Sequence, residues 1–103
     1  MNINCPFCQS NYFQSDNAIY AISYGEGQLV NCSSCRAYLD IDVNNKLIYS
    51  QKYFQSNSLV IYVDFLEEIV GFHLLGNNES KKQKTFHNSE ELQKVIKTFL
   101  MFL

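Results

Sequence analysis

The end of the chain carries the pattern of an amphipathic helix. Asn88 is a favourable N-cap residue, and Glu91 stands three positions later, as in a capping box. Beyond it, one helical stripe is hydrophobic, and its members are Leu92, Val95, Ile96, Phe99, Phe102 and Leu103. The residues between them are mostly polar. This pattern predicts a C-terminal helix that buries one face.

A strict alternation of polarity marks a strand over residues 37–43. One face carries Ala37, Leu39, Ile41 and Val43, and the other carries Tyr38, Asp40 and Asp42. A period of two is typical of a half-buried strand. Asn44 and Asn45 suit a hairpin turn into a further strand over residues 46–49. Upstream, residues 18–24 and 28–31 predict another hairpin, with Gly25-Glu26-Gly27 as its turn.

Two further apolar runs lie in the second half of the chain, over residues 58–64 and 69–75. The first run is β-branched and alternates too little for a strand with one wet face. The two runs predict a central hairpin that is covered on both sides, with the C-terminal helix on one of them. The short basic run Lys81, Lys82 and Lys84 falls in a predicted solvated loop before the helix.

The chain has four cysteines, in two C-x-x-C pairs: Cys5 with Cys8, and Cys32 with Cys35. Two such pairs a few tens of residues apart have the spacing of a tetrahedral four-thiolate zinc site. Four sulfur ligands fill the coordination sphere and leave no position for a substrate. The spacing therefore predicts one structural Zn²⁺ rather than a catalytic metal.

We call each C-x-x-C turn a knuckle, the first at Cys5 and Cys8 and the second at Cys32 and Cys35. The order of knuckle, hairpin, knuckle and strand resembles the zinc ribbon family over residues 3–50. The resemblance implies that Cys5, Cys8, Cys32 and Cys35 are the metal ligands. The sequence departs from the family in two places. Gln9 and Arg36 stand where a glycine often follows the second cysteine of each pair. The predicted hairpin tip offers only Glu26, whereas ribbons of transcript-cleavage factors carry an adjacent Asp-Glu pair there.

The fold class we predict is α+β. A zinc ribbon over residues 1–50 is followed by a ββ(β)α subdomain over residues 51–103, an antiparallel hairpin layer packed with the C-terminal helix. No family is indicated for the second part. We expect the two parts to pack as one compact unit, since no linker of low complexity separates them.

Other uses of the cysteines compete with zinc. Cys5-Pro6-Phe7-Cys8 is similar to the active-site motif of glutaredoxins, but that fold needs a preceding strand and a later cis-proline. Pro6 is the only proline of the chain. A rubredoxin-like iron centre uses the same four ligands, so iron is the minor alternative for the metal. Free thiols without a metal are a third possibility.

Charge and composition limit the partners. The formal net charge is −2, and four thiolates with one zinc ion bring it to about −4. That sign disfavours a protein whose affinity rests on neutralising phosphates. No run approaches the roughly 18 apolar residues of a membrane span, and the first cysteine leaves no room for a signal peptide. We therefore expect a cytoplasmic protein with no membrane association, where thiols stay reduced.

These observations favour a non-enzymatic adaptor or regulator that binds another protein. The chain shows no set of residues that suggests catalysis. The apolar Leu100 and Met101, beside the main helical stripe, are candidates for a partner surface or a homodimer through the helix. The alternative is a nucleic-acid-binding ribbon of the transcription machinery. It would use Tyr20 and Tyr24 for base stacking, with Arg36 and the lysine run.

The expected size of the metal contribution leads to a first prediction. A structural zinc contributes on the order of 10–16 kcal/mol in small modules, and a domain of this size is stable by roughly 5–15 kcal/mol. Zinc removal should therefore unfold the first half, while the second half keeps a partial core.

Overall fold

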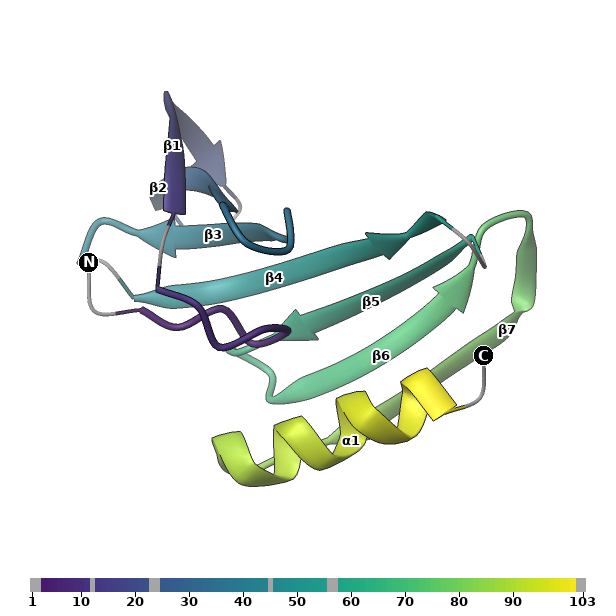
Figure 1. Cartoon of the computed structure of the whole chain (residues 1–103). Helices are drawn as coiled ribbons and strands as arrows, with labels where there is room; N and C mark the ends of the chain where they lie inside the picture. The colour runs from purple at the N-terminus through teal and green to yellow at the C-terminus, as the bar shows by residue number, and fades with distance from the viewer. Residues whose placement is uncertain (1–2, 12, 23–24, 45, 56–57, 102–103) are drawn as a thin grey trace.

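A computed structural model describes residues 3–11, 13–22, 25–44, 46–55 and 58–101. These residues form one antiparallel sheet and one C-terminal helix, which confirms the predicted α+β class (Figure 1). The strands pair in chain order, and their bounds are β1 Phe13–Ile22, β2 Gly25–Cys32, β3 Tyr38–Asp42, β4 Leu47–Phe54, β5 Leu59–Asp64, β6 Ile69–Leu74 and β7 Asn77–Thr85. The helix α1 spans Ser89–Met101.

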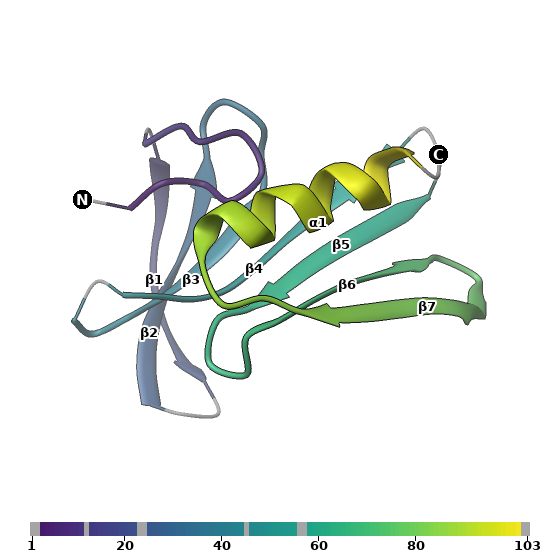
Figure 2. The ribbon, with the colours of Figure 1, turned by 90° about the horizontal axis from the view of Figure 1, so that it is seen from below.

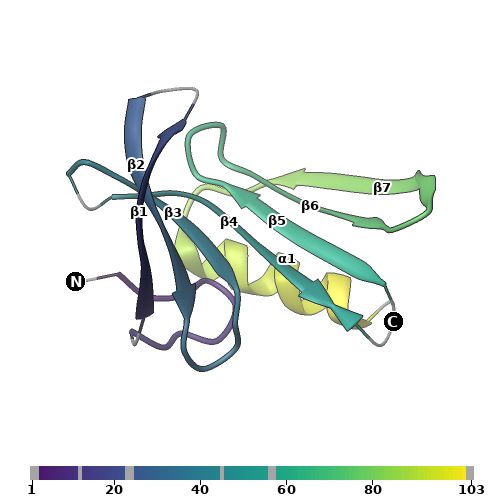
Figure 3. The same ribbon diagram turned by 90° about the horizontal axis from the view of Figure 1, so that it is seen from above.

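The sheet is strongly twisted, so β1 and β2 run across the direction of β5, β6 and β7 (Figure 3). It is also continuous: residue 50, where we placed the boundary between the two parts, lies inside β4, which pairs with β3 on one side and with β5 on the other.

The first hairpin differs from the predicted one. The strand expected over residues 18–24 begins at Phe13, and Gly25-Glu26-Gly27, the expected turn, lies within β2 opposite residues 20–22. Long-range pairing explains the shift, because β2 also pairs with β3 through Gly27↔Asp42. The second hairpin is as expected, and Asp42 Oδ1 fixes its turn by accepting the backbone N–H groups of Asn44 and Lys46, each at 2.9 Å.

The capping residues hold the start of α1. The backbone N–H of Glu91 donates to Asn88 Oδ1 at 2.9 Å, and the Glu91 carboxylate accepts the N–H of His87 at 2.6 Å. The capping-box prediction is confirmed, with the return bond directed one residue before the cap.

The helix covers one face of the sheet, and the N-terminal loop lies on the same face beside the start of the helix (Figure 2). We name the cluster beneath the helix the helix core; its buried members are Leu59, Ile61, Val63, Val70, Phe72, Phe86, Leu92, Ile96 and Phe99. A second cluster lies at the other end of the sheet. We name it the knuckle core; its buried members are Ile3, Cys5, Val30, Cys32, Ala37, Leu39 and Ile41.

The central hairpin is not covered on both sides, contrary to the prediction. Along β5 the buried residues Leu59, Ile61 and Val63 alternate with half-buried residues, so only one face belongs to a core. The other face carries the half-buried Tyr62 and is not covered by the helix. Tyrosine counts as hydrophobic in a sequence pattern, although its hydroxyl group allows it to lie at a solvent-exposed surface. The pattern alone therefore could not show that this face lacks a cover.

The loop predicted around the basic run is also wrong, because Lys81, Lys82 and Lys84 lie in β7. The partner strand supplies the reason: β6 is an apolar run that would otherwise be an unpaired edge. Among the described strands β7 is itself an edge, and lysines on an edge strand disfavour pairing with a second sheet.

Candidate metal centre

The two C-x-x-C turns have the same backbone structure. Each first cysteine accepts a hydrogen bond from the residue four positions later and donates one to the residue five positions later. The bonds are Gln9 N–H to Cys5 O at 2.8 Å, Cys5 N–H to Ser10 O at 2.8 Å, Arg36 N–H to Cys32 O at 2.8 Å and Cys32 N–H to Ala37 O at 2.9 Å. Two turns from distant parts of the sequence thus hold the two cysteine pairs in the same backbone geometry.

The residue after each second cysteine is left-handed. The φ angle is 66° at Gln9 and 65° at Arg36. This conformation costs a residue with a side chain roughly 1–2 kcal/mol, and it explains why glycine is common at these places in zinc ribbons. The chain keeps the knuckle geometry at this cost.

The turns bring the four cysteine sulfurs into one group. All four Sγ atoms lie within 4.8 Å of one another. Across the two knuckles, Cys5 Sγ is 3.5 Å from Cys35 Sγ, and Cys8 Sγ is 3.4 Å from Cys32 Sγ. A tetrahedron with zinc–sulfur bonds of about 2.3 Å has edges of about 3.8 Å, so the donor set fits one ion. The four cysteines are positioned to bind a single structural metal.

Burial differs between the sulfurs of each turn. Cys5 and Cys32 are buried in the knuckle core, whereas Cys35 is half-buried and Cys8 is exposed. Burial raises the pKa of the Cys5 thiol strongly and also raises that of Cys35. Burial also acts to raise the pKa of Cys32, but hydrogen bonds from the backbone of Cys35 and Ser34 and from the thiols of Cys8 and Cys35 together outweigh it and lower that pKa to about 7. A metal that binds these sulfurs displaces their protons.

Polar contacts support the second knuckle. Lys52 Nζ donates to the backbone carbonyl of Cys35 and lies 5.2 Å from the ring centroid of Phe54. Ser34 Oγ donates to Ser10 Oγ at 3.0 Å and so joins the two knuckles. The ammonium group of Lys52 adds positive charge beside a four-thiolate centre, which carries a net charge of −2 with zinc bound.

The first knuckle is tied to the helix. Gln93 Nε2 in α1 donates to the carbonyl oxygen of Pro6 at 2.7 Å. Phe7 packs against both the helix core and the knuckle core. The residues between Cys5 and Cys8 thus connect the metal centre to the second half of the chain.

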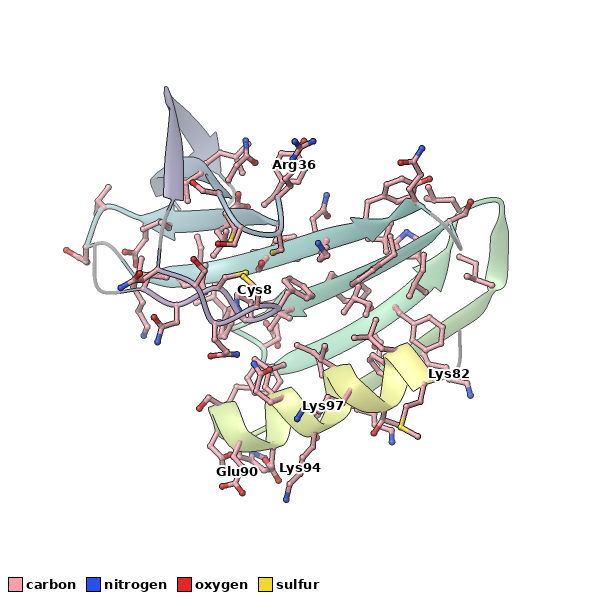
Figure 4. All side chains as sticks on the ribbon, viewed as in Figure 1. Cys8, Arg36, Lys82, Glu90, Lys94 and Lys97 are labelled. Atoms are coloured by element: carbon pink, nitrogen blue, oxygen red, sulfur yellow. The ribbon has the colours of Figure 1, made fainter. Side chains whose placement is uncertain are left out.

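The structure brings together the predicted ligands but not the other predicted site residues. Arg36 is exposed at the second knuckle and points away from α1 (Figure 4). Tyr20 and Glu26 lie in β1 and β2, with side chains outside the described residues, and Tyr24 is itself outside them. Leu100 is half-buried against the helix core, whereas Met101 is 84% exposed.

Three residues around the centre were missed by the sequence interpretation: Lys52, Phe7 and Gln93. Phe7 stands inside the C-P-F-C motif, where its apolar character between two ligands was a usable signal. Lys52 and Gln93 had no such signal, because their partners are backbone carbonyls distant in sequence.

Comparisons with known proteins give no relative: no family model, no curated protein and no solved structure matches the chain. Within the part of the chain that the structure describes, no helix is long and apolar enough to cross a membrane.

Proposed function

We propose that this chain is a small, non-enzymatic zinc-binding adaptor, in which a structural zinc ion held by Cys5, Cys8, Cys32 and Cys35 stabilises a sheet that binds another protein. The single observation that carries the proposal is the group of four sulfurs within 4.8 Å, supplied by two matching knuckles. The zinc ribbon resemblance points the same way.

Zinc is favoured over a redox use of the C-P-F-C motif. The sulfurs of Cys5 and Cys8 each approach a sulfur of the other knuckle. Burial raises the pKa of Cys5, whereas a reactive cysteine needs a lowered pKa. Four thiolates also fill a tetrahedral sphere, so the ion would hold the fold and take no substrate.

A protein partner is favoured over nucleic acid by the charges on the sheet. Asp40 and Asp64 lie among the tyrosines of the face opposite α1, where a phosphate backbone would meet two carboxylates. In β7, Lys82 and Lys84 pair with Phe72 and Val70 of the helix core, so they lie on the other face.

Metal analysis of the purified chain tests the zinc centre. We expect one zinc ion per chain, and loss of most bound zinc in Cys5→Ser and in Cys32→Ser. Ser33→Ala, an exposed neighbour within the second knuckle, is the matched control and should keep the ion. Iron in place of zinc would change the metal but not the centre, whereas a full-length folded chain without metal would contradict the proposal.

Titration with mixed single- and double-stranded oligonucleotides at low and moderate salt tests the partner class. We expect no binding at low salt. Micromolar binding with a steep salt dependence would replace the adaptor by a nucleic-acid-binding ribbon.

A further inference from the structure

The face of the sheet opposite α1 carries two adjacent hollows. We name this surface the open face; its residues are Leu29, Tyr38, Asp40, Tyr49, Gln51, Tyr62, Asp64, Ile69, His73 and Gln83. The first hollow, of about 330 Å³, is lined by Tyr49, Tyr62, Asp64, Ile69, His73 and Gln83. The second, of about 280 Å³, is lined by Leu29, Tyr38, Asp40, Tyr49 and Gln51. Each hollow therefore contains two tyrosines, one aspartate and one glutamine, and Tyr49 is shared.

The strand register explains the repetition. Tyr49 of β4 stands directly opposite Asp40 of β3 on one side and Asp64 of β5 on the other. Adjacent strands are about 4.8 Å apart, so the two aspartates are separated by about 10 Å across the sheet, with a tyrosine between them. Directly opposed side chains on one face lie within contact distance.

The first hollow is built around a glycine. Tyr62 pairs with Gly71 of β6, and a Cβ atom on Gly71 would lie 2.5 Å from Tyr62 Oη and 2.8 Å from the backbone oxygen of Lys82. The phenol can lie across β6 only because this position has no side chain. Gln83 Nε2 then donates to Tyr62 Oη at 2.6 Å and fixes the ring. The ring of His73 lies 6.3 Å from that of Tyr62, centroid to centroid.

The two carboxylates have capacity for a cation. Asp64 uses Oδ1 to accept the backbone N–H groups of Leu66 and Glu67, at 3.0 and 3.1 Å, and its Oδ2 has no partner among the described residues. Asp40 is half-buried, and the described residues provide no cation or hydrogen-bond donor for it. Burial raises the pKa of Asp40, so the ionised form is held at a cost that a bound cation would relieve.

The lining matches the chemistry of a guanidinium or ammonium group. Carboxylates bind such groups by charge-assisted hydrogen bonds, and tyrosine rings bind them by cation–π contact. An anion is disfavoured in both hollows. The described cation nearest to the second hollow is Arg36, which lines an adjoining depression with Asn31, Cys32 and Ser33; Tyr38 lies in the wall of both.

We propose that the open face binds basic side chains of a partner protein, one arginine or lysine in each hollow, about 10 Å apart. This inference rests on the proposed adaptor function and gives the chemical class of its partner. The zinc knuckles would hold β2 and β3, and hence the hollow around Asp40, in place.

A peptide titration followed by amide chemical shifts tests the proposal on the intact, metal-loaded chain. The probe is Ac-Gly-Arg-Pro-Pro-Arg-Gly-NH₂, whose polyproline II spacer places the two arginines on one side, about 9 Å apart. We expect shifts concentrated at the open face and an affinity that falls with salt. The same peptide with Glu in place of both Arg residues should not bind, and a peptide with a single Arg should bind more weakly.

Substitutions on the face give the second readout. Asp40→Asn and Asp64→Asn should each weaken binding about fivefold or more, because each removes the charge from one hollow. Glu90→Gln, on the outer surface of α1 (Figure 4), is the matched control and should leave the affinity unchanged. The amide spectra of the free variants report whether each chain remains folded. Arg36→Gln should leave peptide binding unchanged or strengthen it, whereas a nucleic-acid site at this surface would be weakened by the same change.

The proposal is overturned if the Arg peptide produces no shifts at the open face, if the Glu peptide binds equally well, or if neither aspartate variant weakens binding. With one zinc bound and no oligonucleotide binding, such a result rejects the cation site alone and leaves the adaptor in place. Oligonucleotide shifts at Tyr38, Tyr49 and Tyr62 without peptide binding would reject both.

Discussion

The two ends of this molecule are stabilised in different ways. The helix core has nine buried residues, three of them phenylalanines, and a helix covers it. Phe72 and Phe99 meet edge to face at a centroid distance of 4.8 Å. The knuckle core has seven buried residues, two of which are cysteines and none aromatic. The apolar surface buried in a core of this kind is enough to stabilise the packing of the helix on the sheet.

The difference suggests why the candidate metal site lies at the end of the sheet with the smaller core. The strands β1, β2 and β3 turn away from the helix as the sheet twists, so α1 does not cover them (Figures 1 and 3). Small cores leave little free energy to offset the ordering of the chain. A metal ion held by the four cysteines would provide the missing stabilisation, because it would cross-link residues 5–8 to residues 32–35. Predictions that separate the two cores test this interpretation.

Metal removal should have the largest effect. Chelation of the proposed zinc ion, or Cys5→Ser, should remove on the order of 10 kcal/mol from the stability of the knuckle core. Amide hydrogen exchange should lose protection in β1, β2 and β3 and keep it in β5, β6 and α1. Ser33→Ala is the control without effect. Loss of protection throughout the chain would show that the two cores unfold as one.

A cavity in the helix core should act on the other end. Phe99 is 1% exposed, and Phe99→Ala should lower the free energy of unfolding by about 3–5 kcal/mol, measured by denaturant titration. The bound metal should stay near one ion per chain. Met101→Ala, at an exposed position of the same helix, should change stability little. Metal loss in Phe99→Ala would contradict the separation of the cores.

The hydrogen bond between the helix and the first knuckle should contribute less to stability. Gln93→Ala removes the donor to the Pro6 carbonyl and should cost about 1 kcal/mol in the metal-loaded protein. The same substitution should cost almost nothing after chelation, because the first knuckle is then unfolded. Lys97→Ala, exposed on the same helix, serves as the control. An equal cost with and without metal would show that Gln93 does not report on the knuckle.

Relief of the knuckle strain should have a small stabilising effect. Arg36 has a φ of 65°, and Arg36→Gly should raise stability by about 0.5 kcal/mol, the strain removed less the added freedom of the unfolded chain. Thermal denaturation of the metal-loaded protein measures it. Ser33→Gly, in the same turn, lacks this compensation and should not stabilise. A destabilised Arg36→Gly would show that the arginine makes a stabilising contact.

Asp40 should give the smallest effect, and its sign depends on pH. Burial raises its pKa, so the folded protein binds this proton more tightly than the unfolded chain does. The ionised carboxylate therefore lowers stability above its folded pKa, and this penalty disappears as pH falls through that value. Asp40→Asn should raise the free energy of unfolding at pH 7 by less than Arg36→Gly does, and the gain should vanish below the ordinary aspartate pKa of about 3.9.

Asp64→Asn is the contrasting substitution for the last prediction. The Asp64 carboxylate accepts two backbone N–H groups of its own turn, so its loss should destabilise the protein at pH 7. Equal changes in stability at pH 7 for the two substitutions would contradict this prediction. A stability gain at Asp40 together with a loss of peptide binding would mark a residue kept for binding rather than for folding.

The sequence predicted well where the signal is local. The N-cap Asn88, the helical stripe and the two C-x-x-C turns each depend on residues within a few positions of one another. The alternation in residues 37–43 likewise identified β3 and its outward face. It failed at the lysine run, because whether residues 77–85 form a loop or a strand depends on the need of β6 for a partner.

By itself, then, the sequence determined the helix, the α+β class and the four cysteines of the candidate metal site, since helix periodicity and C-x-x-C spacing are properties of short segments. Only the tertiary structure placed the four sulfurs within 4.8 Å of one another and joined Pro6 to Gln93. It alone set Tyr49 between Asp40 and Asp64. The register of neighbouring strands decides which side chains share a face, and that register arises from pairing across the whole sheet.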